Sequence, residues 1–232
     1  MRAIYLTQLS SLVPGPKIEL NSKEVVHHLK NVIRVKSGEK LKLLDGVGLE
    51  VTCCVTQVSK KSISIDVVDI CSHESAAVID LAFGAVKKAA SEEIIRLSVE
   101  LGFRKVTSVL TEYSQKDFLS SERCDRILSS ALEQSNNPFM PIIENGVKLE
   151  EINYGKYARV YFFHPGGKQE SCSESKAGEG SLLLIGPEGG FGPEEIDFLK
   201  SLENTQQISL PTPILRAPTA VPAAFGYVLR DL

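Results

Sequence analysis

Strand-like and helix-like segments alternate over the last two thirds of the chain, and this alternation constrains the fold more than any other feature. Apolar runs of strand length lie at residues 78–83, 106–110, 158–163, 181–185 and 207–210. Helical patterns lie among and after them, at residues 91–101, 121–135, 193–202 and 219–229. Such alternation is typical of a mostly parallel sheet covered by helices. The sequence therefore predicts an α/β domain in this part of the chain.

The N-terminal part of the chain has a different pattern. Strand-like segments at residues 40–44, 49–58 and 62–70 follow one another closely, and Asp45-Gly46 forms a turn signal between the first two. One helix interrupts them: Ser22 can cap it, and Val25, Val26, Leu29, Val32 and Ile33 make an apolar stripe. Short strands at this spacing indicate a small β-barrel. Because the pattern changes near residues 71–75, we expect two domains, residues 1–72 and 73–232.

Composition limits the class of protein. The chain is 43% hydrophobic and 24% charged, which is typical of a globular protein, and it has neither a secretory signal nor a membrane-length apolar run. Its five cysteines contain no CxxC pair, so we expect no disulfide framework and no metal site, and a cytoplasmic location. The net charge of −3 is unlike that of a uniformly basic nucleic-acid binder, but a local basic face stays open.

A glycine-rich loop is the most informative candidate site. Residues 186–190 read Gly-Pro-Glu-Gly-Gly, between a strand and a helix that begins with Pro193, and open α/β sheets bind ligands at such strand ends. The loop has no Lys, Ser or Thr, so it does not match a phosphate cradle. Glu188, Glu194 and Glu195 would repel an anion and tolerate a cation such as the sulfonium of S-adenosylmethionine (SAM). Plain turn chemistry, with glutamates that complement the helix dipole, is the alternative.

Two further strand ends carry candidate side chains. Arg216 lies among apolar residues and prolines after the strand at 207–210, where a charge needs a partner from a ligand or from a structural ion pair. His164 follows the strand at 158–163, and a lone histidine there, like the pair His27-His28, is interpreted as structural. If the glycine loop lines a cofactor cleft, Gly189→Val is expected to fill that cleft.

Several motifs resemble one family of enzymes, the 16S rRNA (uracil-N3)-methyltransferases called RsmE. Residues 28–34, His-Leu-Lys-Asn-Val-Ile-Arg, resemble the family's HLxxVLR block, and Asp45-Gly46 resembles its turn. Further matches are Glu100-Leu101-Gly102, Glu133-Gln134-Ser135, the loop at 186–190, and Ile214-Leu215-Arg216 followed by Thr219-Ala220. The resemblance covers nearly the whole chain.

The resemblance implies a fold and a set of site residues. It implies a PUA-like, RNA-binding barrel at residues 1–72 and a SPOUT methyltransferase domain at residues 73–232, with a C-terminal trefoil knot and a homodimeric assembly. It implies Arg34 as an RNA-binding residue. SAM would bind in the knot, and its contacts would be Ile185, Gly186, Glu188, Gly189, Gly190, Leu210, Ile214, Leu215 and Arg216, with Arg216 also as the catalytic residue.

The implied reaction is methyl transfer to N3 of a uridine in 16S ribosomal RNA or the small ribosomal subunit. Positioning and fixed charges can supply much of the catalysis, with Arg216 as the polarising or RNA-orienting group, and no proton acceptor is identified. The chain departs from the family pattern at Ala90, Leu97, Tyr113, Asn137 and Pro218; Tyr113 stands in the family's Glu-Arg-Ser motif. Two alternatives therefore stay open: a SPOUT protein that binds RNA without catalysis, and a SPOUT methyltransferase with another RNA target.

Overall fold

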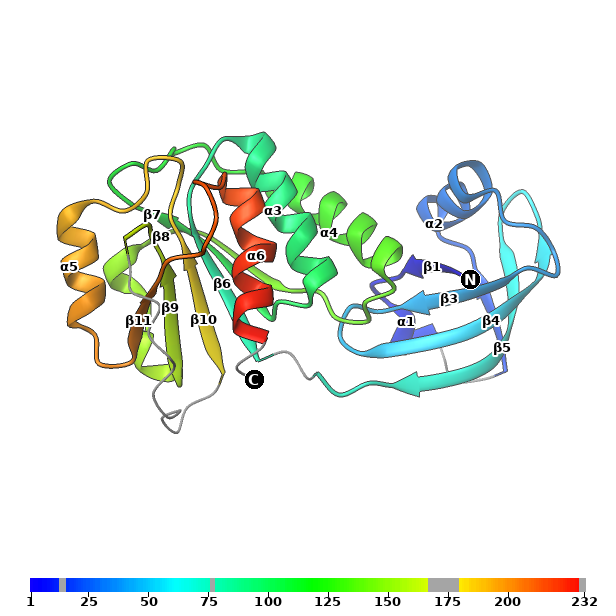
Figure 1. Ribbon diagram of the computed structural model, residues 1–232. Coiled ribbons are helices and arrows are strands. Elements are labelled where there is room, and N and C mark those ends of the chain that lie inside the picture. Colours follow the sequence, from blue (N-terminus) through cyan, green and yellow to red (C-terminus); the bar gives the residue numbers. More distant parts are fainter. Residues whose placement is uncertain (13–15, 76–77, 167–179, 230–232) are drawn as a thin grey trace. The chain divides into compact units, whose positions relative to one another are not determined.

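The computed structural model describes residues 1–12, 16–75, 78–166 and 180–229, and the chain divides into two compact units (Figure 1). The first consists of residues 1–75 and 129–140, and the second of residues 76–128 and 141–232. The sequence pattern places residues 129–140 in the second domain, whereas in the structure they join the N-terminal unit. Most of the segment between the strand expected at 158–163 and the one expected at 181–185 lies outside the described residues.

A five-stranded sheet forms the first unit. Its strands lie in the order β1 (Arg2–Tyr5), β3 (Lys40–Leu44), β4 (Leu49–Val58), β5 (Ile63–Ser72) and β2 (Lys17–Leu20). β1 runs parallel to β3, and the other pairs are antiparallel. The sequence pattern predicts β3, β4 and β5. It misses β1 and β2, because four residues are too few to display a strand's alternation.

Alternate side chains of these strands build the core of the first unit. Val51, Cys53 and Val55 of β4 meet Ile63 and Ile65 of β5, all fully or almost fully buried. Burial raises the pKa of the Cys53 thiol to about 11, so this cysteine stays protonated and acts as a small apolar side chain.

The helical segment of the first unit differs from the prediction. After the short helix α1 (Leu9–Leu12), α2 (Lys23–His27) continues into a π-helix, η1 (His28–Ile33). The Ser22 side chain makes no capping hydrogen bond; its carbonyl oxygen accepts one from the amide of Val26 at 2.9 Å. Val32, expected on the apolar stripe, is 61% exposed. A π-helix joins residues five apart, so a spacing counted at 3.6 residues per turn no longer selects the buried face.

Two polar anchors hold the first unit together at the predicted motifs. One carboxylate oxygen of Asp45 accepts hydrogen bonds from the amides of Val47 at 2.8 Å and Leu49 at 2.9 Å, which confirms the turn. Near the end of helix α4 (Ser121–Ser135), the carboxylate of Glu133 accepts a hydrogen bond from the amide of Tyr5 at 3.0 Å. This bond ties the end of α4 to the first strand of the sheet.

A six-stranded parallel sheet forms the second unit. Its order is β11 (Thr205–Ile208), β9 (Arg159–Phe163), β10 (Ser181–Ile185), β6 (Ile79–Gly84), β7 (Lys105–Leu110) and β8 (Ile142–Lys148). The expected parallel α/β domain is therefore confirmed. The sequence pattern misses β8, because this edge strand is only partly buried and lacks an apolar run.

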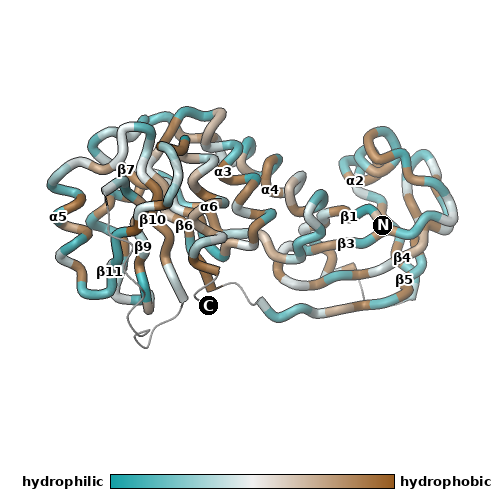
Figure 2. The backbone as a smooth tube through the Cα atoms, viewed as in Figure 1, coloured by the Kyte–Doolittle hydropathy of each residue, from teal (hydrophilic) through white to brown (hydrophobic). Residues whose placement is uncertain are grey.

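Successive residues of the central strands face opposite sides of this sheet. Leu81 of β6 and Leu183 of β10 join the core under α3 (Lys88–Leu101) and α6 (Ala217–Leu229), which lie side by side (Figure 1). Leu182 and Leu184 face the other core, with α5 (Pro193–Ser201) and the short helices η2 (Leu149–Glu151) and η3 (Tyr154–Lys156). The central strands are accordingly apolar over most of their length, apart from Asp80 and Ser181 at their amino ends (Figure 2).

The order of the strands brings three loops together at the carboxyl ends of neighbouring strands. β10 lies between β9 and β6, and β11 lies on the other side of β9. Because all three strands are parallel, the loops that follow β9, β10 and β11 meet at their carboxyl ends. The trefoil knot stays a prediction from the resemblance. No helix within the described ranges is long and apolar enough to cross a membrane.

Candidate functional site

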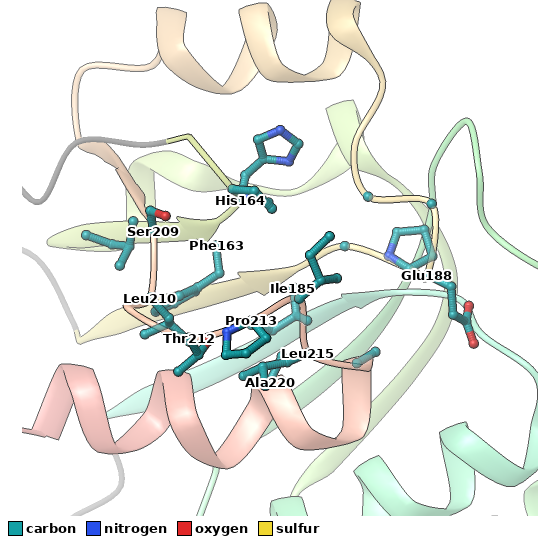
Figure 3. Close-up of a pocket in the computed structure, with 18 residues that line it drawn as sticks. Phe163, His164, Ile185, Glu188, Ser209, Leu210, Thr212, Pro213, Leu215 and Ala220 are labelled. Atoms are coloured by element: carbon teal, nitrogen blue, oxygen red, sulfur yellow. The ribbon is translucent and has the colours of Figure 1, made fainter.

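A cavity of about 270 Å³ lies where these three loops meet the start of α6 (Figure 3). Its lining includes all but one of the residues for which the resemblance implies a cofactor contact: Ile185, Gly186, Glu188, Gly189, Gly190, Leu210, Ile214 and Leu215; Arg216 is the exception. These residues come from segments about 25 positions apart in the chain. The structure therefore brings the two predicted motifs into one hollow.

The glycine-rich loop forms one wall of the cavity through a tight turn. The amide of Gly190 donates a hydrogen bond to the carbonyl oxygen of Pro187 at 2.9 Å, and Gly190 has a φ of +74°. A side chain is strained in this left-handed conformation, so glycine is required here. The loop thus presents mostly backbone atoms to the cavity.

Gly189 is required for a different reason. A Cβ atom on Gly189 would lie 2.7 Å from the Cβ atom of Tyr113, closer than real side chains approach. The expectation that Gly189→Val fills the cleft is therefore corrected, because the new side chain would meet Tyr113 and push the two loops apart.

The three glutamates near this loop have different surroundings. The Glu195 carboxylate accepts hydrogen bonds from the amides of Gly192 and Glu112, both at 2.8 Å, so it caps α5 and ties it to the loop after β7. Glu194 is exposed. Glu188 is also exposed, and its carboxylate points away from the centre of the cavity (Figure 3). Glu195 therefore stabilises the fold around the loop. Glu188 lines the cavity but does not fill it with its side chain.

His164 also lines the cavity, although the sequence pattern treats it as structural only. Its amide donates to the carbonyl oxygen of Ile208 at 3.0 Å, and its ring lies near Gly190. Burial and the charge of Lys200 lower the pKa of the imidazole. The wall therefore carries a neutral ring at neutral pH. The signal that could have revealed it is its position at the carboxyl end of β9.

Other lining residues also escaped the sequence analysis. Phe163, Pro165, Thr212, Pro213 and Ala220 line the cavity, mostly with apolar surface (Figure 3). No Lys or Arg is among the lining residues that the structure describes. The hollow is thus apolar, rich in backbone and free of positive charge, which suits a ligand with a flat apolar ring and a cationic centre.

Arg216 lies beside the cavity and is not part of its lining. Its side chain is exposed, and it has no ion-pair partner among the described residues. Its carbonyl oxygen accepts hydrogen bonds from the amides of Thr219 and Ala220 at 2.9 Å, so the backbone of Arg216 starts α6. Of the two expected partners, a structural ion pair is therefore not found among the described residues, and a partner from a ligand stays a prediction.

Arg34, the predicted RNA-binding residue, lies in the first unit. It ends the π-helix in a left-handed conformation with a φ of 59°, and its side chain is exposed. No group of metal-ligating side chains is found in the parts of the chain that the structure describes.

Residues 73–229 match the family described as RNA methyltransferase domain, and residues 20–68 match the family described as RNA methyltransferase PUA domain. The chain belongs to the RNA methyltransferase domain family. The expected resemblance and the N-terminal PUA-like unit are thereby confirmed. The match covers the whole six-stranded sheet and the cavity.

Individual members of the family are similar along the whole chain. The "Ribosomal RNA small subunit methyltransferase E" of Rickettsia conorii is 29% identical over 230 residues, which cover 97% of this chain and 93% of that protein. A methyltransferase structure from Legionella pneumophila, in complex with the bound cofactor SAM, is 27% identical with a TM-score of 0.81, covering 100% of this chain and 98% of that one. The methyltransferase E of Neisseria gonorrhoeae, bound to SAM, has a TM-score of 0.76 at 24% identity over 98% and 96% of the two chains, and it supports the fold alone.

Proposed function

We propose that the protein is a SAM-dependent methyltransferase that modifies N3 of a uridine in 16S ribosomal RNA, in the cytoplasm and as a homodimer. The observation that carries the proposal is the cavity at the carboxyl ends of β9, β10 and β11. All the residues for which the resemblance implies a SAM contact line it, except Arg216. The names of the relatives, which are small-subunit rRNA methyltransferases, support the substrate class.

The lining of the cavity fits SAM chemically. The apolar side chains of Phe163, Leu210 and Leu215 suit the adenine ring, and the backbone of the loop at 186–190 offers amide and carbonyl groups to the polar parts. His164 is neutral at neutral pH, so it does not repel a sulfonium. When bound, SAM supplies an electrophilic methyl group.

The remaining groups then have to prepare the RNA base. Uracil N3–H is a weak acid, so the reaction needs a freed lone pair at N3, polarised carbonyl oxygens and alignment with the methyl donor. Arg216 is exposed beside the cavity, and its guanidinium is free to contact RNA or a uracil oxygen. We assign it the polarising or RNA-orienting role, and we assign Arg34 an RNA contact in the PUA-like unit.

Filling the cavity tests the cofactor assignment. Ala220 lies in the first turns of α6 and lines the cavity, so Ala220→Leu places a larger side chain where SAM would bind. Calorimetry is expected to show SAM affinity reduced by about 100-fold or more, because overlap with a ligand costs several kcal/mol. Ala223→Leu, on the same helix and outside the lining, is the matched control and should bind as wild type. Unchanged SAM affinity in Ala220→Leu would place the cofactor elsewhere.

The reaction is tested on small ribosomal subunits from a strain that lacks this protein. Incubation with the protein and SAM, followed by mass spectrometry of the nucleosides, is expected to reveal new 3-methyluridine. A different methylated nucleoside would indicate another RNA target. SAM binding without any methylated nucleoside would favour a protein that binds RNA without catalysis.

A further inference from the structure

Tyr113 is an exposed aromatic residue in contact with the glycine-rich loop. It lies in the turn that follows β7, and 46% of its surface is accessible. Its Cβ atom packs so closely on Gly189 that any side chain on that glycine would overlap with it. Because Gly189 lines the cavity, Tyr113 stands at the cavity's edge. The proposed function gives no role to this residue.

The turn that carries Tyr113 is held in place by hydrogen bonds on three sides. Within the turn, the amide of Thr111 donates to the Ser114 hydroxyl at 3.0 Å, and that hydroxyl donates to the Thr111 carbonyl oxygen at 2.8 Å. The amide of Gln115 donates to the carbonyl oxygen of Ala85, at the end of β6, at 2.7 Å. The amide of Glu112 donates to the Glu195 carboxylate at 2.8 Å. A ring on such a fixed turn loses little conformational freedom when a ligand packs on it.

Two exposed lysines lie on segments next to this turn, and the charged groups near the Tyr113 ring itself are Glu112 and Glu195. Lys87 follows the loop after β6, Lys116 follows Tyr113 by three residues, and both are exposed. Neither has an ion-pair partner among the described residues, whereas the neighbouring Lys88 pairs with Asp117 at 2.9 Å. Proteins bind single-stranded RNA with such a combination of exposed cations and an exposed aromatic ring, because cations contact phosphates and rings stack on bases.

We propose that the ring of Tyr113 is the stacking platform for the uracil that is methylated. This inference rests on the proposed function. A base must leave the helical stack before an enzyme can act on it, and the freed base commonly stacks on an aromatic side chain. Stacking contacts the face of the ring and leaves its edge free. A uracil stacked on Tyr113 can therefore turn the N3 edge toward the cavity that holds the methyl donor.

The phenol group of Tyr113 stays neutral in this arrangement. A hydrogen bond with the Glu112 carboxylate raises the pKa of Tyr113. The hydroxyl is therefore not available as a proton acceptor, and the platform acts through its ring. This separates Tyr113 from Arg216, which acts through charge.

Kinetics with small ribosomal subunits from a strain lacking the protein test the role of the ring. Tyr113→Ala is expected to lower kcat/KM by about 5- to 150-fold, the range expected for loss of one stacked base. Tyr113→Phe keeps the ring and should stay within about twofold of wild type. Tyr113→Arg keeps a planar group that can stack, so its kcat/KM should lie between those two variants. The Kd for SAM, measured by calorimetry, should be unchanged in all three.

Fluorescence gives a direct measurement of stacking. The chain contains no tryptophan, so Tyr113→Trp introduces a single indole at the proposed platform. Titration with a short oligouridylate in the presence of SAM is expected to quench its emission. Phe198→Trp, whose ring would lie on α5 against Tyr154, is the matched control and should not respond.

The outcomes separate this inference from the proposed function. If wild-type protein leaves the subunits unmethylated, the proposed function fails. If wild-type protein methylates them and Tyr113→Ala does so with equal kcat/KM, the stacking role is overturned and the function stands. Loss of SAM binding, or a changed oligomeric state, in Tyr113→Ala would also overturn it, because Tyr113 would then support the cofactor loop or a contact between copies of the chain.

Discussion

His164 shows how one residue can make cofactor binding depend on pH. Burial and Lys200 lower the pKa of this imidazole below its usual value of 6.5. The folded state therefore binds this proton less readily than the unfolded chain does. Its contribution to stability is complete above the unfolded pKa and falls as the pH decreases through that value.

The same titration should affect SAM affinity. As the pH falls below 6.5, the protonated fraction of His164 rises and places a positive charge in the wall beside a cationic ligand, so SAM affinity should fall, by roughly tenfold once the imidazole is protonated. Calorimetry at several pH values measures this. His164→Gln keeps a neutral polar side chain and should remove most of the dependence. If the SAM affinity of His164→Gln falls with pH as much as that of the wild type, another group causes the pH dependence.

Arg216 should affect turnover more than cofactor binding. Its side chain is exposed and outside the cavity lining, so Arg216→Ala is expected to lower kcat by more than about tenfold with SAM affinity and melting temperature unchanged. Arg216→Lys keeps the charge without the planar fork and should recover only part of the activity. Wild-type methylation by Arg216→Ala would exclude Arg216 from the mechanism.

Pro218, one of the departures from the family pattern, has a simple structural explanation. It is the second residue of α6, where an amide would have no partner inside the helix and the fixed φ of proline suits the helix. The departure therefore leaves the start of α6 intact, so it does not by itself argue against an enzyme.

At the scale of elements, β10, its loop and α5 form a unit whose loop supplies one wall of the cavity. Glu195 joins this unit to the turn after β7 by accepting hydrogen bonds from Gly192 and Glu112. Glu195→Ala leaves both amides without this acceptor. We expect a loss of about 1–2 kcal/mol of unfolding free energy and weaker SAM binding.

Urea unfolding and calorimetry measure these two effects. Glu194→Ala is the matched control, since Glu194 lies in the same first turn of α5, is exposed and accepts no such pair of bonds. Its unfolding free energy should change by less than about 0.5 kcal/mol. Equal effects of the two variants would mean that helix-dipole charge matters here and the hydrogen bonds do not.

At the scale of the whole molecule, the carboxyl and amino ends of the strands in the parallel sheet have different roles. The cavity lies at the carboxyl ends of the strands, and the buried carboxylate of Asp80, which is 1% exposed, lies at the amino end of β6. Asp80 accepts hydrogen bonds from Arg104 at 2.9 and 3.2 Å and from the Tyr157 hydroxyl at 2.8 Å. Burial and this bond raise the pKa of Tyr157, which therefore stays a donor. The network joins β6 to the segments that precede β7 and β9.

Removal of this carboxylate should destabilise the protein without changing its chemistry. Asp80→Ala leaves Arg104 and Tyr157 without their acceptor, and we expect a loss of about 3–5 kcal/mol of unfolding free energy in urea. Glu144→Ala is the control: it breaks the pair with Lys105 on the same sheet, but the Glu144 side chain is 44% exposed, so about 0–1 kcal/mol is expected. A large loss of kcat/KM in folded Asp80→Ala protein would contradict a purely stabilising role for the amino ends of the strands.

Much of the second unit could be predicted from periodicity, because each strand and helix there buries its own apolar face. The helix at residues 121–135 and the strand at 181–185 are found with their predicted bounds. Periodicity reports which face of a segment is buried and says nothing of its neighbour. The partly buried edge strand β8 and the transfer of residues 129–140 to the first unit therefore escaped it.

In the candidate site, too, some features could be predicted from the sequence and others appeared only in the structure. The glycine-rich loop and the segment at 214–216 are local motifs, so the sequence by itself determined where a ligand would be sought. Only the tertiary structure decided that His164 joins the wall, that Arg216 stays outside it, and that Tyr113 rests on Gly189. The physical reason is that a cavity is made by segments far apart in the chain. Their meeting depends on strand order and close packing, which no single segment encodes.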